Sequence, residues 1–139
     1  MLTVKDLVAG YSNMPAIHGI SFEVKQGQIV ALLGSNGAGK TTTLRAITNV
    51  IRPDSGSVTY KGKSLAGVPS YKMVELGISM IPEGRHLFPK MSVLDNLMMG
   101  AYSVKDKSLI QEKLETVYEI FPRLAERKRQ LAGTMSGGE

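Results

Sequence analysis

The chain has 139 residues, 42% of them hydrophobic, and a net charge of +5. A chain of this length forms one domain or part of a larger one, and its charge suits an anionic ligand, an anionic membrane surface or nucleic acid without choosing among them. It has no cysteine and only two histidines, which excludes disulfides, thiolate catalysis and cysteine-based metal sites and argues against a histidine-rich one.

The N-terminus and the length of the apolar runs bear on where the protein resides. Lys5, Asp6 and Gly10 interrupt the N-terminal stretch, which therefore does not resemble a signal peptide. No apolar run approaches the roughly 20 residues that are needed to span a bilayer. We expect a cytoplasmic chain, or one that is at most peripheral to a membrane.

The first third of the chain alternates strands and helices. Residues 2–8 are rich in apolar side chains, and residues 16–24 alternate as in a half-buried strand. Residues 29–33 are all apolar, which predicts a strand buried on both faces, as in a parallel sheet. A glycine-rich loop follows, and the apolar spacing of residues 41–51 then predicts a helix.

Shorter elements are expected in the middle of the chain. Residues 57–63 have the pattern of an exposed strand, and residues 70–76 form a short helix candidate that Gly77 ends. Residues 78–82 are mostly apolar and predict another strand. A loop follows this strand.

The remainder, up to about residue 130, has a helical pattern. Ser92 with Asp95 three residues later predicts the start of a helix over 93–100. Apolar residues at helical spacing predict a longer helix over 107–121. Pro122 ends this helix and is well suited to begin another short one.

The glycine-rich loop is the most specific motif in the chain. It matches G-x-x-x-x-G-K-[ST] in full, the pattern of a loop that binds nucleoside triphosphates. Glycines let backbone N–H groups turn toward phosphate oxygens, and the following helix directs its free N–H groups and positive dipole end at the same anion. The motif consists of Gly34, Ser35, Asn36, Gly37, Ala38, Gly39, Lys40 and Thr41.

The side chains at the end of the motif have separate predicted roles. Lys40 is expected to stabilise charge on the β- and γ-phosphates, Thr41 to bind Mg²⁺ through its hydroxyl, and Thr42 to add a phosphate contact. The alternative, a glycine-rich turn with an incidental lysine, does not explain why an apolar strand pattern precedes the loop and an amphipathic helix pattern follows it. The loop predicts a nucleoside triphosphate with Mg²⁺ and does not indicate which base.

A second motif connects this loop to a family. Residues 135–139, MSGGE, resemble the LSGGQ signature of ABC-transporter ATPases, and they stand at a fitting distance from the phosphate loop. The resemblance covers the whole chain. It implies an α/β fold, a P-loop NTPase core with an antiparallel β region around residues 1–26 and 57–64. It also implies a helical subdomain over about 84–134, all within a single, incomplete ABC ATP-binding domain over residues 1–139.

The resemblance also implies roles for individual residues. Tyr11 stands at the family's aromatic position ahead of the phosphate loop and would stack on adenine. Glu83 stands where most relatives have the glutamine of the glutamine loop, and would contact Mg²⁺. Ser136, Gly137 and Gly138 would act in trans, facing the γ-phosphate of ATP held by a partner subunit.

A closer resemblance concerns the transported solute. The segment IPEGRHLFPKMSVLDNL and the later AGTMSGGE are similar to the F-type ATPase of bacterial branched-chain amino acid importers. This implies an ATPase whose hydrolysis of MgATP drives amino acid uptake at the cytoplasmic face of the inner membrane. The implied partners are a second ATPase subunit, identical or different, two membrane permeases and, indirectly, an external binding protein. No nucleic acid is implied.

Three alternatives remain at this point. ATPases of urea and short-amide importers are close relatives of the F-type ATPase. A small P-loop kinase or GTPase would need its own base-recognition motif, and no N-K-x-D occurs. Residues 1–139 also lack the family's Walker B aspartate, catalytic glutamate and switch histidine. The resemblance therefore implies the N-terminal part of an ABC ATPase, which as given would bind nucleotide without turnover.

Overall fold

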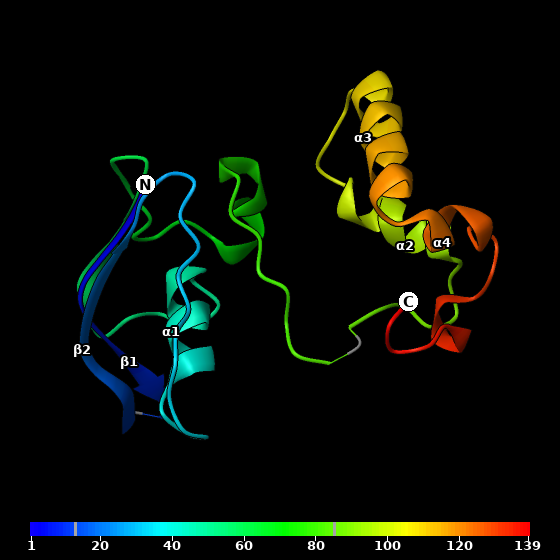
Figure 1. Ribbon diagram of the computed structural model, residues 1–139. Coiled ribbons are helices and arrows are strands. Elements are labelled where there is room, and N and C mark those ends of the chain that lie inside the picture. Colours follow the sequence, from blue (N-terminus) through cyan, green and yellow to red (C-terminus); the bar gives the residue numbers. More distant parts are fainter. Residues whose placement is uncertain (13, 85) are drawn as a thin grey trace. The chain divides into compact units, whose positions relative to one another are not determined.

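The computed structural model describes residues 1–12, 14–84 and 86–139, which form two compact units, Met1–Ile81 and Pro82–Glu139 (Figure 1). Arg85, in the IPEGR segment, lies outside the described residues. Within the described part, no helix combines the length and the apolar character that a membrane crossing requires.

The first unit contains one antiparallel sheet of four strands, in the order β2-β1-β3-β4. The strands are β1 (Leu2–Tyr11), β2 (Met14–Val24), β3 (Ser55–Tyr60) and β4 (Lys63–Ser64). β1 lies at the centre, because Leu2 pairs with Val24 on one side and with Tyr60 on the other. This confirms the antiparallel β region expected from the sequence.

Helix α1 (Lys40–Ile47) packs against this sheet and closes the core of the first unit (Figure 1). In β1 the buried side chains are Val4, Leu7 and Ala9, and an irregularity in the register between Val4 and Leu7 interrupts the alternation of the strand. Burial of each large side chain stabilises the fold by about 1.5–3 kcal/mol. The buried core residues are Val4, Leu7, Ala9, Ile17, Ala46, Ile47, Val58, Leu65 and Met73.

Helix α1 is shorter than the sequence pattern indicated, because residues 48–51 leave the helix. Asn49 adopts a left-handed conformation, with φ of 52°. Its side-chain amide donates hydrogen bonds to the carbonyls of Leu65 and Val68, at 2.6 and 2.8 Å. An asparagine tolerates this conformation and satisfies buried carbonyls there, so tertiary contacts override the helical spacing.

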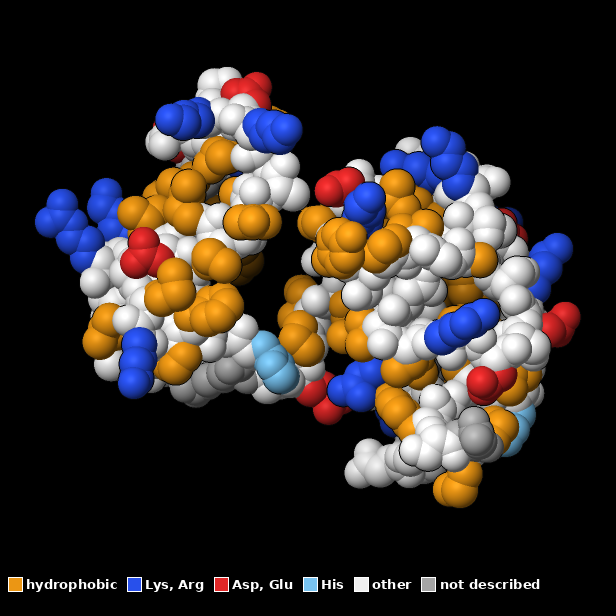
Figure 2. Space-filling model, turned by 180° about the vertical axis from the view of Figure 1, so that it is seen from behind, with side chains coloured by type: hydrophobic (Ala, Val, Ile, Leu, Met, Phe, Trp, Pro, Cys, Tyr) orange, Lys and Arg blue, Asp and Glu red, His pale blue; other side chains and the backbone are white. Residues whose placement is uncertain are grey.

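The two predicted apolar strands, residues 29–33 and 78–82, are absent. The prediction is wrong at this point for a physical reason: a strand exists only where its backbone pairs with a neighbour. No described strand pairs with either segment. Ile29, Leu33 and Ile81 are consequently 97%, 88% and 93% exposed, and Figure 2 shows hydrophobic side chains at the molecular surface.

Part of each apolar segment nevertheless lines a pocket of the first unit. Residues 30–32 and 78–80 line one cavity of about 420 Å³ together with side chains of α1, β1 and β2. The predicted helix over 70–76 forms as two 3₁₀ turns, Ser70–Lys72 and Val74–Leu76. Gly77 ends the second turn with φ of 86°.

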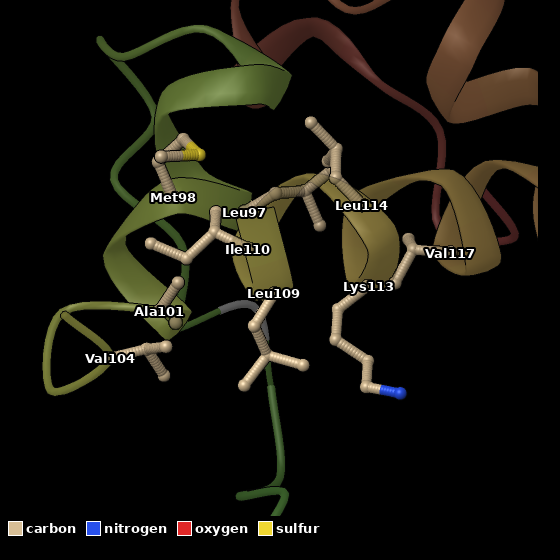
Figure 3. A pocket seen from close by; sticks show the side chains of 10 residues that line it. Leu97, Met98, Ala101, Val104, Leu109, Ile110, Lys113, Leu114 and Val117 are labelled. Carbon is tan, nitrogen blue, oxygen red and sulfur yellow. The ribbon is translucent and has the colours of Figure 1, made fainter. Parts of the chain in front are cut away.

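The second unit is helical and agrees with the sequence pattern. It contains α2 (Val93–Gly100), α3 (Lys107–Ile120), α4 (Pro122–Glu126) and a 3₁₀ turn, Ala132–Thr134. Apolar side chains of α2 and α3, among them Leu97, Ala101, Ile110 and Leu114, line a pocket of about 260 Å³ (Figure 3).

Both long helices of this unit have side-chain caps. Ser92 accepts a hydrogen bond from the backbone N–H of Asp95, and the Asp95 carboxylate accepts from the N–H of Ser92, which completes the expected capping box. Asp106 caps α3 and accepts from Ser108 and Leu109. The hydrogen bond from the Ser108 hydroxyl is the largest cause that lowers the pKa of Asp106, followed by those from the two backbone N–H groups.

Backbone hydrogen bonds tie the segment before α2 to the segment after α4. Val93 N–H donates to Gln130 at 2.9 Å, and Ala132 N–H donates to Met91 at 2.9 Å. Gly133 N–H donates to Pro89 at 3.1 Å. We call these two paired segments, 89–93 and 130–133, the backbone clamp. It closes the helical unit on itself.

The capping box generates a stability prediction. Ser92→Ala removes the hydroxyl that accepts from Asp95, and the free energy of unfolding should fall by about 1 kcal/mol, as for other N-cap losses. Ser103→Ala is the matched control, because Ser103 lies exposed in the turn after α2 and should change stability by less than about 0.5 kcal/mol. Urea denaturation measures both. Equal effects of the two substitutions would contradict the role of the cap.

Candidate nucleotide-binding site

The phosphate loop is held in shape by glycines in left-handed conformations. Gly37 and Gly39 have φ of 86° and 85°, values that L side chains rarely adopt. Gly39 also lies close against β2: a Cβ built on it would be 2.5 Å from Cγ2 of Ile17 and 2.7 Å from the carbonyl oxygen of Ala16. The loop can therefore approach the sheet only with glycine at position 39.

Lys40 follows the loop as the first residue of α1, and its side chain folds back over the loop. Its ammonium donates hydrogen bonds to the carbonyl oxygens of Gly34 and Ser35, at 2.9 and 2.7 Å. These bonds hold the positive charge at the loop backbone, where the motif predicts bound phosphate. Ala38 N–H donates to the Ser35 carbonyl at 3.2 Å and tightens the same turn.

The N-terminus of α1 is open to an anion. Its N-cap, Gly39, provides no side chain to bond the first N–H groups, and no acidic residue stands in the first turn. Such an end attracts anions through its free N–H groups and the helix dipole. Thr41 is exposed here, whereas Thr42 and Thr43 are buried. The Thr43 hydroxyl donates to the Gly39 carbonyl at 2.9 Å.

Tyr11 ends β1 within the same unit as the loop, and its side chain is 45% exposed. Its hydroxyl accepts a hydrogen bond from Nη1 of Arg45, at 3.0 Å. This hydrogen bond is the main cause that lowers the pKa of Tyr11, and a hydrogen bond with Thr42 adds to it. The ring thus combines an exposed aromatic surface with a hydroxyl fixed to α1.

The oxygen ligands available at this site suit a magnesium ion that also binds phosphate. Mg²⁺ in nucleotide sites takes one or two protein oxygens and keeps phosphate oxygens and waters as its other ligands. The exposed Thr41 hydroxyl beside Lys40 meets that requirement. In the described part of the chain, no three histidine or acidic side chains gather as a cage for a metal ion. Glu83 is exposed and belongs to the second unit.

The residues of the signature motif lie at the end of the second unit. Met135 is buried, whereas Ser136, Gly137 and Gly138 are exposed. The N–H of Ser136 donates to the Glu139 carboxylate at 2.9 Å, and the same carboxylate pairs with Arg127 at 2.9 Å. The hydrogen bond from the Ser136 N–H is the largest cause that lowers the pKa of Glu139.

Comparison with known proteins decides the family. The sequence profile described as "ABC transporter" matches residues 17–139.

The chain belongs to the ABC transporter family.

This ABC chain is similar along its whole length to curated relatives. It is 44% identical over 139 residues to the high-affinity branched-chain amino acid transport ATP-binding protein BraG of Pseudomonas aeruginosa, covering 100% of this chain and 59% of BraG. It is 32% identical to the probable branched-chain amino acid transport ATP-binding protein LivF of Archaeoglobus fulgidus, covering 100% of this chain and 58% of that one. The chain thus spans less than two thirds of these relatives.

Solved structures bear out the fold. One, described as the ATP binding subunit of an ABC transporter, superposes with a TM-score of 0.84 at 29% identity, covering 99% of this chain and 57% of its own. An ATP-binding cassette of an ABC transporter gives 0.85 at 25% identity, covering 99% and 60%. The α/β ABC ATPase fold expected from the sequence is therefore confirmed.

Three contacts in this ABC chain were not anticipated from its sequence. The bond between Arg45 and Tyr11 joins residues that are 34 positions apart, and no local sequence pattern predicts it. The contact between Ser136 and Glu139 has a local signal, because S-x-x-E is the spacing of a capping box. Arg127, which pairs with Glu139, has no such signal.

The close approach of Gly39 to β2 generates a second prediction. Gly39→Ala adds left-handed strain and forces Ile17 aside, so the free energy of unfolding should fall by about 2–5 kcal/mol. Gly37→Ala is the matched control: its φ is similar, but nothing lies within 4 Å of the added Cβ, so the loss should be about 1–2 kcal/mol. Chemical denaturation distinguishes the two, and equal losses would refute the steric argument.

Proposed function

We propose that this chain is the ATP-binding part of an ABC importer, in which hydrolysis of MgATP drives the uptake of branched-chain amino acids. The observation that carries the proposal is the phosphate loop with Lys40 held over its backbone, in a chain 44% identical to a branched-chain amino acid transport ATP-binding protein. The loop supports nucleotide binding, and the similarity supports the solute.

The phosphate end of ATP is proposed to bind at the loop and the start of α1. Backbone N–H groups of Gly34 to Gly39 surround the phosphates, and Lys40 exchanges its two carbonyl contacts for oxygens of the β- and γ-phosphates. Thr41 holds Mg²⁺ and Thr42 supports the phosphate contact from the buried side. When bound, Mg²⁺ neutralises charge that develops on the phosphate oxygens. The adenine is proposed to stack on Tyr11.

Glu83 is proposed as a second Mg²⁺ ligand at the position of the glutamine loop. A carboxylate accepts hydrogen bonds and binds a cation as a glutamine carbonyl does, but it cannot donate and it adds a negative charge near the γ-phosphate. Its interaction with the nucleotide should therefore depend on Mg²⁺ more strongly than that of a glutamine.

The signature residues Ser136, Gly137 and Gly138 are proposed to contact the γ-phosphate bound to a second ATPase subunit, identical or different. Small exposed residues with a hydroxyl and free N–H groups suit a phosphate that arrives from outside the chain. The other proposed partners are two permeases and, through them, an external binding protein. The protein would act at the cytoplasmic face of the inner membrane. Residues 1–139 alone are proposed to bind nucleotide without turnover.

Replacing Lys40 tests the phosphate site. In the whole protein, Lys40→Ala should lower Mg²⁺-dependent ATP hydrolysis by about 100-fold, the scale for removal of a group that stabilises developing charge. Lys63→Ala, on the exposed strand β4, is the control and should leave turnover unchanged. Phosphate release measures both. Undiminished turnover by the Lys40 variant would contradict the proposed phosphate site. Sustained turnover by residues 1–139 alone would contradict only the proposal that they bind nucleotide without turnover.

Uptake measurements test the transported solute. The whole protein is assembled with its permease subunits in vesicles, and uptake of labelled leucine is compared with uptake of labelled urea. ATP-dependent accumulation of leucine, lost in the Lys40→Ala variant, is the expected result. ATP-dependent accumulation of urea without leucine would assign the chain to the urea and short-amide importers instead.

A further inference from the structure

Tyr11 and Arg45 are joined across the first unit by one hydrogen bond. Tyr11 is the last residue of β1, and Arg45 stands in the last turn of α1. Nη1 of Arg45 donates to the Tyr11 hydroxyl at 3.0 Å. In the described part of the chain, no carboxylate forms an ion pair with Arg45. The tyrosine hydroxyl instead accepts a hydrogen bond from its guanidinium.

This bond restrains a ring that would otherwise be mobile. A tyrosine side chain turns about two bonds, and this one stands at a strand end and is 45% exposed. Ser12 follows with φ of 50°, and the chain turns back so that Met14 of β2 pairs with Tyr11. A hydrogen bond at the far end of the ring fixes both rotations, because the hydroxyl is the atom farthest from the backbone.

We propose that Arg45 is a positioning residue for the nucleotide base: it holds the Tyr11 ring in the orientation in which adenine stacks on it. This inference rests on the proposed function and deepens it. The same helix, α1, then receives the phosphates at its first turn and fixes the base platform from its last. Phosphate and base are thereby placed at a set distance from each other along one rigid element.

The tyrosine hydroxyl then contributes to nucleotide binding, although the hydroxyl itself does not touch the base. A phenylalanine ring stacks on a base as a tyrosine ring does, so a platform that depends on stacking alone would tolerate Tyr11→Phe. Tyr11→Phe removes the hydrogen bonds with Arg45 and with Thr42 together, whereas Arg45→Gln removes only the first. If Arg45 positions the ring, Arg45→Gln should weaken ATP binding no more than Tyr11→Phe does, and it should add nothing once Tyr11→Phe is in place.

Binding of ATP and of tripolyphosphate separates the base from the phosphates. Calorimetry on the whole protein should show ATP bound about 2- to 5-fold more weakly by Tyr11→Phe and by Arg45→Gln, the scale of one partly exposed hydrogen bond. The double variant should bind ATP no more weakly than Tyr11→Phe alone. Arg45→Lys keeps a charged donor and should recover part of the loss. Tripolyphosphate, which has no base, should bind to Arg45→Gln and Arg45→Lys as tightly as to the unsubstituted protein, because these two variants keep the bond between Tyr11 and Thr42.

A spectroscopic measurement checks the bond itself. Since Arg45 lowers the pKa of Tyr11, Arg45→Gln should raise the pH at which one tyrosine ionises, followed by ultraviolet absorbance. The chain has five tyrosines, so the signal is assigned by subtracting the titration of the Tyr11→Phe variant. That variant should show no further change when Arg45→Gln is added.

Several results would overturn the inference without touching the proposed function. These are ATP binding unchanged in both single variants, effects that add in the double variant, or equal weakening of ATP and tripolyphosphate by Arg45→Gln. The last result would assign Arg45 to phosphate binding or to folding, and a thermal melt separates those two. Failure of the unsubstituted protein to bind ATP would instead overturn the proposed function.

Discussion

The close approach of the Gly39 backbone to β2 determines where the phosphate loop lies. The loop has no regular structure of its own, so its position follows from what it touches. At Gly39 it meets Ile17 and Ala16 with no room for a side chain, and α1 begins at the next residue. The contact of Gly39 with Ile17 and Ala16 therefore connects the start of α1 to the buried face of the sheet. Lys40 and the open helix end take their places from this contact, and Arg45 joins Tyr11 to the same helix.

The parts of the fold that were predictable are those that local physics determines. Helix α2 begins where Ser92 and Asp95 satisfy each other's N–H groups, and α4 begins at Pro122, whose missing N–H costs nothing there. The alternation in β2 likewise follows from the strand period. Residues 29–33 were not predictable in this way. Their apolar run describes a strand with neighbours on both sides, and within the described residues no neighbour pairs with them.

In the candidate site, too, the predictable residues are those whose role follows from the local sequence. The phosphate loop could be recognised because eight consecutive residues carry its chemistry and its φ requirements. Tyr11 and the signature residues could be recognised only through their resemblance to a family, since an isolated tyrosine or a Ser-Gly-Gly run carries no chemistry of its own. Arg45 could not be recognised at all. Its partner is 34 residues away, and only the packing of α1 on the sheet brings the two together.

The backbone clamp of the second unit has a mechanical consequence. Residues 89–93 and 130–133 are joined by main-chain hydrogen bonds, and Pro89 lies so close to Gly133 that a Cβ there would be 2.7 Å from its ring. Helices α2, α3 and α4 therefore lie between two segments that are bonded to each other. The position of the segment that follows Glu83 and that of the segment that leads to Ser136 are coupled through these main-chain bonds and not through the helices.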